Sequence, residues 1–168
     1  QQTGEQKRSL QNEMARFNTA IAITSAKIIK TTGEIDSLEK EIVALVGKIG
    51  KLDVSLDQLS KILIKRISET YKKGRLEPIS LLFSSKDFTE FVSRYKYLRV
   101  MQINDRKIMT QMEDVRTNFE DQKTVKEQKQ IELEAAKSKL ESQKKLIAQQ
   151  RLDKENLLKI TQNNELTS

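Results

Sequence analysis

Carboxylates are the side chains of this sequence that could supply acid–base or metal chemistry, since Asp and Glu together number 24. Histidine and cysteine are both absent, which removes the commonest general base, the thiolate nucleophile and the usual zinc ligands. The carboxylates alternate with 31 Lys and Arg residues along helix-like stretches, where nothing shifts a pKa or excludes water. The sequence therefore predicts no catalytic residue, no metal site and no cofactor.

The composition favours long helices over a wide globular core. Apolar residues make up 36% of the chain and charged residues 33%, with five glycines and one proline. Such a composition is typical of helices that share a narrow seam. No apolar run approaches the roughly 20 residues that cross a bilayer. Because the chain begins at Gln1 with no methionine, we expect a processed or truncated piece of a longer protein, from which any export signal or second domain has been removed.

A seven-residue apolar period predicts a first long helix over residues 7–73. The period is a strong signal of a coiled coil. Threonine occupies part of the companion position, so we expect a seam that is tight between Ile35 and Leu63 and looser near Thr24. The period holds at Met14, Ile21, Ile28, Ile35, Ile42, Ile49, Leu56 and Leu63, with Phe17, Thr24, Thr31, Leu38, Leu45, Leu52 and Leu59 three residues further on.

A second long helix is predicted over residues 87–160, after a hinge at residues 74–86 that includes a short helical turn. Gly74 and Pro78 end the first helix, and Ser84 or Ser85 is expected to cap the second. The second seam is interrupted by Asp105, Gln122, Lys126 and Lys129, where either the register shifts or the helix faces solvent. We expect residues 1–6 to be disordered and residues 161–168 to be frayed.

The fold class is therefore all-α: a long antiparallel two-helix coiled-coil hairpin with a short helical, aromatic-rich tip. Two helices joined by about a dozen residues must run antiparallel, because so short a connection cannot return the chain to a parallel start. With a hinge near residue 80, Ile42 should lie level with roughly Lys126 to Lys129, and Ile21 with roughly Ile147.

Two surfaces are candidates for partner binding. The tip holds eight residues that either pack as a plug closing the hairpin or form a binding knob. The open end carries apolar residues that two helices cannot all bury, which favours a docking surface there, although ordinary exposed residues or self-association would also explain them. The tip set is Tyr71, Leu81, Leu82, Phe83, Phe88, Phe91, Tyr95 and Tyr97; the open-end set is Phe17, Ile21, Ile23, Ile29, Leu146, Leu152 and Leu157.

The net charge of +7 raises the question of acidic partners. Between Tyr71 and Arg99 seven bases face three acids, and basic surfaces can bind nucleic acid or anionic membrane. Bases and acids are interleaved along most of the second helix, and no aromatic platform lies on a basic groove. We therefore expect no nucleic-acid partner.

The tip carries a more specific pattern than the heptads. It reads Tyr71-x-x-Gly74, Leu81-Leu82-Phe83, Ser85, Phe88, Phe91, Arg94, Tyr97 and Asp105-Arg106, followed by a Lys/Glu/Gln-rich helix with Gln143-Lys144. This pattern resembles the coiled-coil domain of bacterial murein hydrolase activators of the EnvC and PcsB group. The resemblance covers residues 10 to 158.

The resemblance implies a non-catalytic regulatory module of an exported peptidoglycan hydrolase or hydrolase activator. It implies an extracytoplasmic location, in the periplasm or at the cell surface, after signal peptide removal. It also implies docking onto the extracytoplasmic domain of an FtsX-like membrane protein in an FtsEX-like complex at division, and a LytM-type domain C-terminal to Ser168. A cytoplasmic structural or tethering coiled coil, unrelated to the cell wall, is the alternative.

Overall fold

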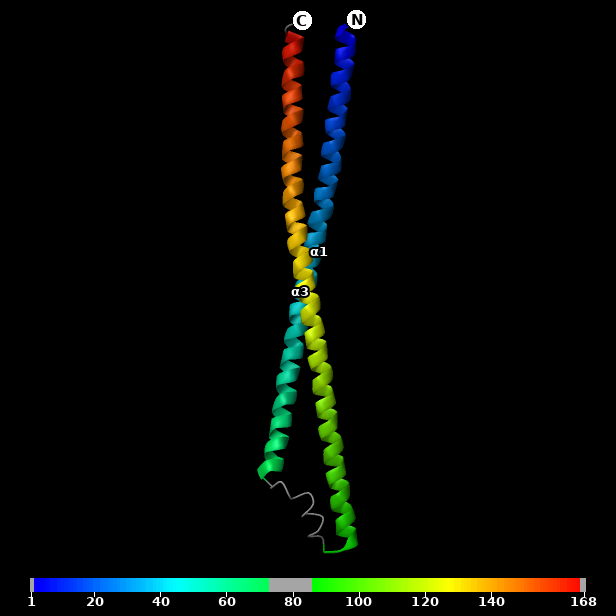
Figure 1. Ribbon diagram of the computed structural model, residues 1–168, viewed down its shortest axis with the longest axis vertical. Helices are drawn as coiled ribbons and strands as arrows, with labels where there is room; N and C mark the ends of the chain where they lie inside the picture. Colours follow the sequence, from blue (N-terminus) through cyan, green and yellow to red (C-terminus); the bar gives the residue numbers. More distant parts are fainter. Residues whose placement is uncertain (1, 73–85, 167–168) are drawn as a thin grey trace. The chain divides into compact units, whose positions relative to one another are not determined.

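Two long helices make up the computed structural model, which describes residues 2–72 and 86–166 (Figure 1). Helix α1 spans Gln2–Lys72 and helix α3 spans Phe88–Leu166. No strand occurs within these ranges. The all-α helical hairpin predicted from the sequence is confirmed. The short helical turn predicted for the hinge lies outside the described residues.

Both helices extend into segments that were expected to be irregular. Helix α1 begins at Gln2 and not at residue 7, and helix α3 continues to Leu166 and not only to residue 160. At the N-terminal end Gln, Glu, Lys and Arg have high helix propensity, and Glu5 in the first turn complements the helix dipole. At the C-terminal end the Thr161 hydroxyl donates to the Leu157 carbonyl at 2.8 Å. The described parts of residues 1–6 and 161–168 are therefore helical in the structure, where the sequence predicted disorder and fraying.

The chain divides into two compact units. One, the open-end unit, combines Gln1–Val43 with Glu127–Ser168; the other, the hinge-end unit, is Ala44–Lys126. In each unit a length of α1 packs against a length of α3.

The predicted seam is the set of positions that the two helices cover. In α1 each seam residue from Met14 to Leu63 is half-buried or buried. In α3 the seam continues with an unbroken seven-residue period through its polar members, because Asp105, Gln122, Lys126 and Lys129 are all half-buried. Neither a register shift nor an outward-facing stretch is needed to accommodate them.

The tightest part of the seam is not where the sequence predicted it. Thr31 is 1% exposed and Thr24 3%, whereas the aliphatic residues from Ile35 to Leu63 are only half-buried. A threonine is short enough for one opposing helix to enclose, whereas a longer side chain between only two helices stays partly wet. The Thr24 hydroxyl donates to the Ala20 carbonyl at 3.0 Å, so its polar atom is satisfied. The expectation of a loose seam near Thr24 was wrong.

The antiparallel register of the open-end unit is set by a contact between charged side chains. The Lys129 ammonium lies 3.0 Å from a carboxylate oxygen of Glu41 on the other helix. This contact confirms that Ile42 lies level with the Lys126 to Lys129 section of α3.

In the hinge-end unit a second ion pair crosses the seam. The Arg66 guanidinium donates to the Asp105 carboxylate, and both side chains are partly buried. Arg66 continues the heptad of α1 seven residues after Leu59, so both partners occupy seam positions. Asp105 is therefore a register-setting seam residue that pairs across the helices.

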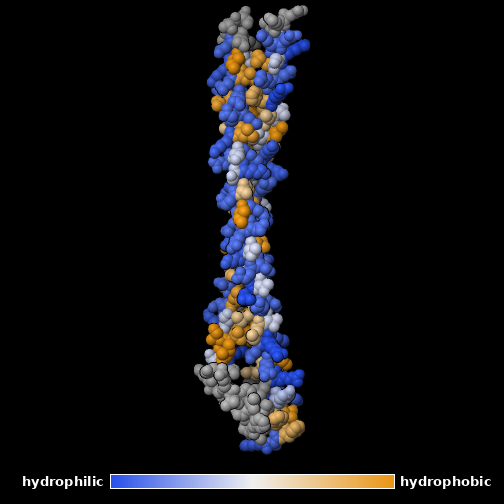
Figure 2. Space-filling model, viewed as in Figure 1, coloured by the Kyte–Doolittle hydropathy of each residue, from blue (hydrophilic) through white to orange (hydrophobic). Residues whose placement is uncertain are grey.

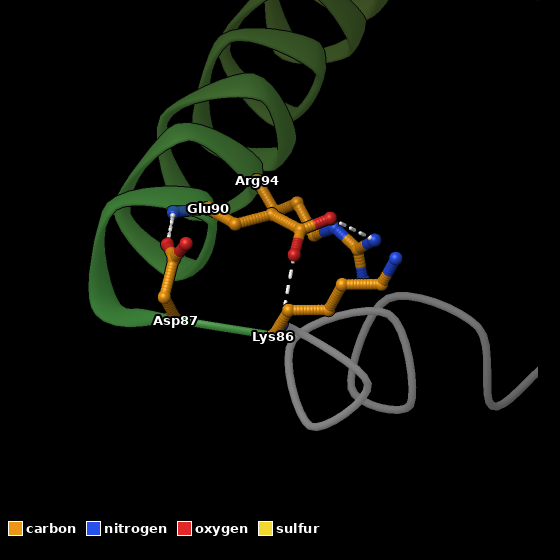
Figure 3. A network of polar contacts seen from close by, with 4 residues as sticks. All are labelled: Lys86, Asp87, Glu90 and Arg94. Carbon is orange, nitrogen blue, oxygen red and sulfur yellow. Dashed lines mark hydrogen bonds and ion pairs between the residues drawn. The ribbon is translucent and has the colours of Figure 1, made fainter.

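Helix α3 begins with a cap formed by Asp87 (Figure 3). The Asp87 carboxylate accepts a hydrogen bond from the Glu90 amide at 2.8 Å, and the Glu90 carboxylate accepts one from the Lys86 amide at 2.7 Å. Arg94 holds the same Glu90 carboxylate at 2.6 Å. This Asp-x-x-Glu arrangement resembles a capping box, and it corrects the expectation that Ser84 or Ser85 would cap the helix.

Enclosure of Thr31 is testable by charge insertion. Thr31→Glu should lower the free energy of unfolding by about 3 kcal/mol, because it places an unpaired carboxylate inside the seam. Thr32→Glu is the matched control, since Thr32 is the exposed neighbour and a surface change costs about 0.5 kcal/mol or less. Chemical denaturation followed by circular dichroism measures both. Equal losses for the two variants would contradict the enclosure.

The Arg66–Asp105 pair should show a positive coupling energy in a double-mutant cycle. We expect about 0.5 to 1 kcal/mol for Arg66→Gln and Asp105→Asn, because the pair is partly exposed and screened by solvent. The exposed Arg116–Glu113 pair is the control and should couple more weakly. A coupling energy of zero between Arg66 and Asp105 would contradict the role of this ion pair in setting the register.

Candidate functional site: a groove on one flank of the open-end unit

The candidate site is a flank of the open-end unit where small side chains leave a groove between α1 and α3. The groove has a volume of about 480 Å³. Its floor is apolar, formed by Leu38 and two alanines, and its rim carries acids and a lysine. The lining residues are Glu34, Ser37 and Leu38 from α1, and Glu132, Ala135, Ala136 and Lys139 from α3.

Two of the predicted binding residues lie on this same flank. Ile23 precedes Ser37 by two heptads, and Leu146 follows Lys139 by one heptad, so each repeats the angular position of a groove residue. The register set by Glu41 and Lys129 also places Ile23 and Leu146 level with one another. Ile23 is 51% exposed and Leu146 50%. We call the groove together with Ile23 and Leu146 the groove flank.

The other predicted binding residues are not brought together with this pair. Ile29 is 71% exposed, but it lies six residues after Ile23, which is about 120° away around the helix. Leu152 is half exposed and projects from the outer face of α3. Phe17, Ile21 and Leu157 are half-buried seam residues. The open-end set is thus part seam and part surface, and only Ile23 and Leu146 share the groove flank.

Figure 2 shows apolar residues interrupting the hydrophilic surface of this unit near the N and C termini. The large apolar side chains of this unit that are at least half exposed are Ile23, Ile29, Val43, Ile131, Leu146, Leu152 and Ile160. A partner could therefore contact aliphatic groups on this unit.

Electrostatics at the groove are shaped by Lys129, which lies in the seam one turn from the groove. Its hydrogen bond to Glu41, with the negative charges of Glu132 and Glu41, raises the pKa of the Lys129 ammonium above its usual value. The Lys129 ammonium lies 3.7 Å from the Glu132 carboxylate and therefore offsets part of the negative charge of the acidic rim. Glu132 belongs to both the ion pair and the groove lining.

The seam beneath the site contains two buried polar atoms without partners. The side-chain oxygens of Gln143 and Gln150 find no hydrogen-bond partner among the described residues. An unsatisfied buried acceptor costs about 1 to 3 kcal/mol. The open-end unit therefore contains two energetically unfavourable groups in its seam, one heptad apart.

At the other end of the hairpin, the predicted tip plug is only partly described. Leu81, Leu82 and Phe83 lie outside the described residues, as do the side chains of Tyr71 and Tyr97. Phe88 and Phe91 stack with ring centroids 6.5 Å apart. Phe88 was expected to be packed but is 78% exposed, and Tyr95 is 47% exposed. The plug as a whole stays a prediction.

Neither a metal cluster nor a membrane span is found in the described ranges. No group of three or more metal-ligating side chains occurs within residues 2–72 and 86–166. Neither α1 nor α3 contains a stretch apolar enough to cross a bilayer.

Sequence reasoning identified the exposed aliphatic residues but missed the groove. The groove depends on Ser37, Ala135 and Ala136, which all have small side chains. A search for large apolar residues overlooks them. The groove could have been predicted from small residues on both helices that the antiparallel register places level with one another.

The polar seam yields a stability prediction. Gln143→Leu with Gln150→Leu should raise the free energy of unfolding by about 1 to 3 kcal/mol, because both unsatisfied oxygens are removed. Gln149→Leu is the control: Gln149 is exposed and hydrogen-bonded to Asp153 at 2.8 Å, so no gain is expected. Thermal unfolding followed by circular dichroism compares them. A destabilised double variant would show that the two oxygens are satisfied in solution.

Comparison with known proteins finds one similarity, over the central part of the chain. Residues 49–128 match the family model described as the coiled-coil domain of the peptidoglycan hydrolase PcsB. The match confirms the resemblance to the EnvC and PcsB group over those residues, a shorter range than 10 to 158. No curated protein and no solved structure matches the chain.

Proposed function

Because residues 49–128 form a PcsB-type coiled-coil segment, we propose that this chain is the non-catalytic regulatory module of an exported peptidoglycan hydrolase or hydrolase activator. In this proposal the coiled coil docks onto the extracytoplasmic domain of an FtsX-like protein in an FtsEX-like complex. That docking controls cell-wall cleavage at division. The catalytic or activating domain, of the LytM type, lies C-terminal to this chain.

The family match is the observation that carries the proposal. It covers nearly the whole hinge-end unit, and it names a coiled-coil domain, which is the part of such a hydrolase that holds no catalytic residues. The chain has no histidine or cysteine, which fits a regulatory part. An extracytoplasmic location follows from the same proposal, since the peptidoglycan substrate lies outside the cytoplasmic membrane.

The groove flank is our proposed docking surface for the FtsX-like domain. It offers an apolar floor, two level aliphatic side chains and a rim of mixed charge. Interfaces of this kind take an apolar side chain into the groove while charged groups around it fix orientation. The closed seam beneath, centred on Thr24, Thr31 and Ile147, provides a rigid support.

Binding of the purified chain to the purified ectodomain of the FtsX-like protein from the same genome tests the proposal. Ile23→Glu with Leu146→Glu should weaken binding at least about tenfold, since charges replace the two level aliphatic contacts. Val43→Glu with Ile131→Glu is the control, because Val43 is 72% exposed and Ile131 73% on the same two helices away from the groove flank. Biolayer interferometry gives each Kd.

The possible results separate the function from the site. If the wild-type chain does not bind the ectodomain, the proposed function falls. If all variants bind as well as wild type, the function stands and the groove flank is the wrong surface. In that second case Ile29→Glu tests a different side of α1. If the partner binds there, Ile29→Glu should reduce binding although the groove-flank variants do not.

A further inference from the structure

The outer face of α3 in the hinge-end unit carries a stripe of bases around two exposed aliphatic residues. Its members recur at helical spacing, three, four, seven, ten and eleven residues after the first, so they share the face turned away from the seam. All four bases are exposed. The stripe consists of Lys96, Arg99, Val100, Ile103, Arg106 and Lys107.

Val100 and Ile103 occupy the centre of this stripe. Val100 is 56% exposed and Ile103 49%, and Lys96 and Arg99 lie on one side of them along the helix, with Arg106 and Lys107 on the other. Long basic side chains can lay their apolar stems along such a centre while their charged ends reach outward. The stripe therefore joins positive charge to apolar surface on a single convex helix face.

Within residues 2–72 and 86–166 no acid forms an ion pair with the stripe. From Phe91 to Met112 the sequence holds one acid, Asp105, which lies in the seam and is bound by Arg66. None of the four stripe bases forms an ion pair within the described part of the chain. Elsewhere on α1 and α3 four exposed lysines pair with a carboxylate four residues away, as Lys40 does with Asp36.

The net charge of the chain is concentrated in the same unit. Residues 44–126 hold 17 bases and 11 acids, whereas the open-end unit holds 14 bases and 13 acids. The hinge-end unit thus accounts for six of the seven excess charges. A negatively charged partner would be attracted to this unit over the other.

We propose that the basic and apolar stripe of α3 binds the anionic headgroup surface of a lipid bilayer. A membrane offers phosphates for the four bases and an apolar layer just below them for Val100 and Ile103, which is the arrangement that interfacial helices use. The face belongs to one helix and is convex, so it suits a deformable surface better than a groove-seeking peptide. Exposed Tyr95 and Phe88 on the same helix are residue types that favour the headgroup region.

Co-sedimentation with vesicles tests the proposal on the whole chain. Vesicles of phosphatidylglycerol and phosphatidylcholine should bind the chain, and vesicles of phosphatidylcholine alone should not. Arg99→Glu with Arg106→Glu should lower the partition coefficient about 25-fold or more, since each base near an anionic surface is worth about a fivefold factor. Raising the salt concentration should weaken wild-type binding.

The matched control is Lys137→Glu with Lys144→Glu. These two lysines are exposed, lie on the same helix and are seven residues apart, as Arg99 and Arg106 are. The net charge change is identical, but their neighbours include Glu134 and Glu141. This control should keep most of the vesicle binding. An equal loss of vesicle binding in both double variants would show that only net charge matters. It would overturn the proposal that the stripe is the binding surface.

A third variant separates a bilayer from a soluble acidic partner. Val100→Ser with Ile103→Ser keeps the charge and removes the aliphatic centre, so it should reduce vesicle binding several-fold while leaving binding to soluble polyglutamate unchanged. If polyglutamate competes fully with vesicles and this variant binds vesicles like wild type, the partner is an acidic polymer or protein and the lipid proposal fails. Vesicle binding and ectodomain binding are separate measurements on separate variants, so either proposal can fail alone.

Discussion

Every seam residue in this protein is covered by one opposing helix, and the rest of the structure depends on that constraint. One facing helix leaves most long aliphatic side chains partly exposed, so isoleucine and leucine stay half-buried along most of the described seam, and among the described residues Ile147 alone falls to 8% exposed. Burial is therefore spread thinly over many heptads. Short side chains such as Thr24 and Thr31 are the ones that the partner helix covers completely.

Thin burial gives the polar seam residues a large influence on register. A slip by one heptad would exchange one leucine for another at little cost, but it would separate Arg66 from Asp105 and Lys129 from Glu41. Each separation would cost about 0.5 to 1 kcal/mol, because the paired side chains are partly exposed to solvent. The two ion pairs thus select one alignment among several that the apolar residues alone would tolerate, one pair in each unit.

The sequence was sufficient to predict the hairpin and nearly all of its seam, because a seven-residue period is a direct consequence of helix geometry. It did not determine whether Asp105 and Lys129 face solvent, since their partners lie on the other helix and come close only after folding. The close packing of the seam at Thr24 was not predicted, because the prediction ranked seam positions by hydrophobicity, whereas side-chain length determines how fully the facing helix covers them. The cap was misassigned because Ser84, Ser85 and Asp87 all lie within four residues, and only the backbone geometry selects Asp87.

Of the candidate site, the exposed aliphatic residues were predictable, whereas the groove needed the register that brings Ser37 opposite Ala135 and Ala136.

The scarcity of acidic residues in part of α3 affects both the register of the hinge-end unit and the charge of its surface. A coiled coil with evenly interleaved charge neutralises its lysines locally through pairs four residues apart, as the open-end unit does with Lys145 and Glu141. Between Phe91 and Met112 the acid supply falls to Asp105 alone, and the seam holds that residue against Arg66. The outer face of α3 is left with bases that have no local counter-charge. The position of Asp105 in the seam therefore has two effects. Its ion pair with Arg66 helps to fix the register, and its absence from the outer face leaves the bases there without an acid nearby.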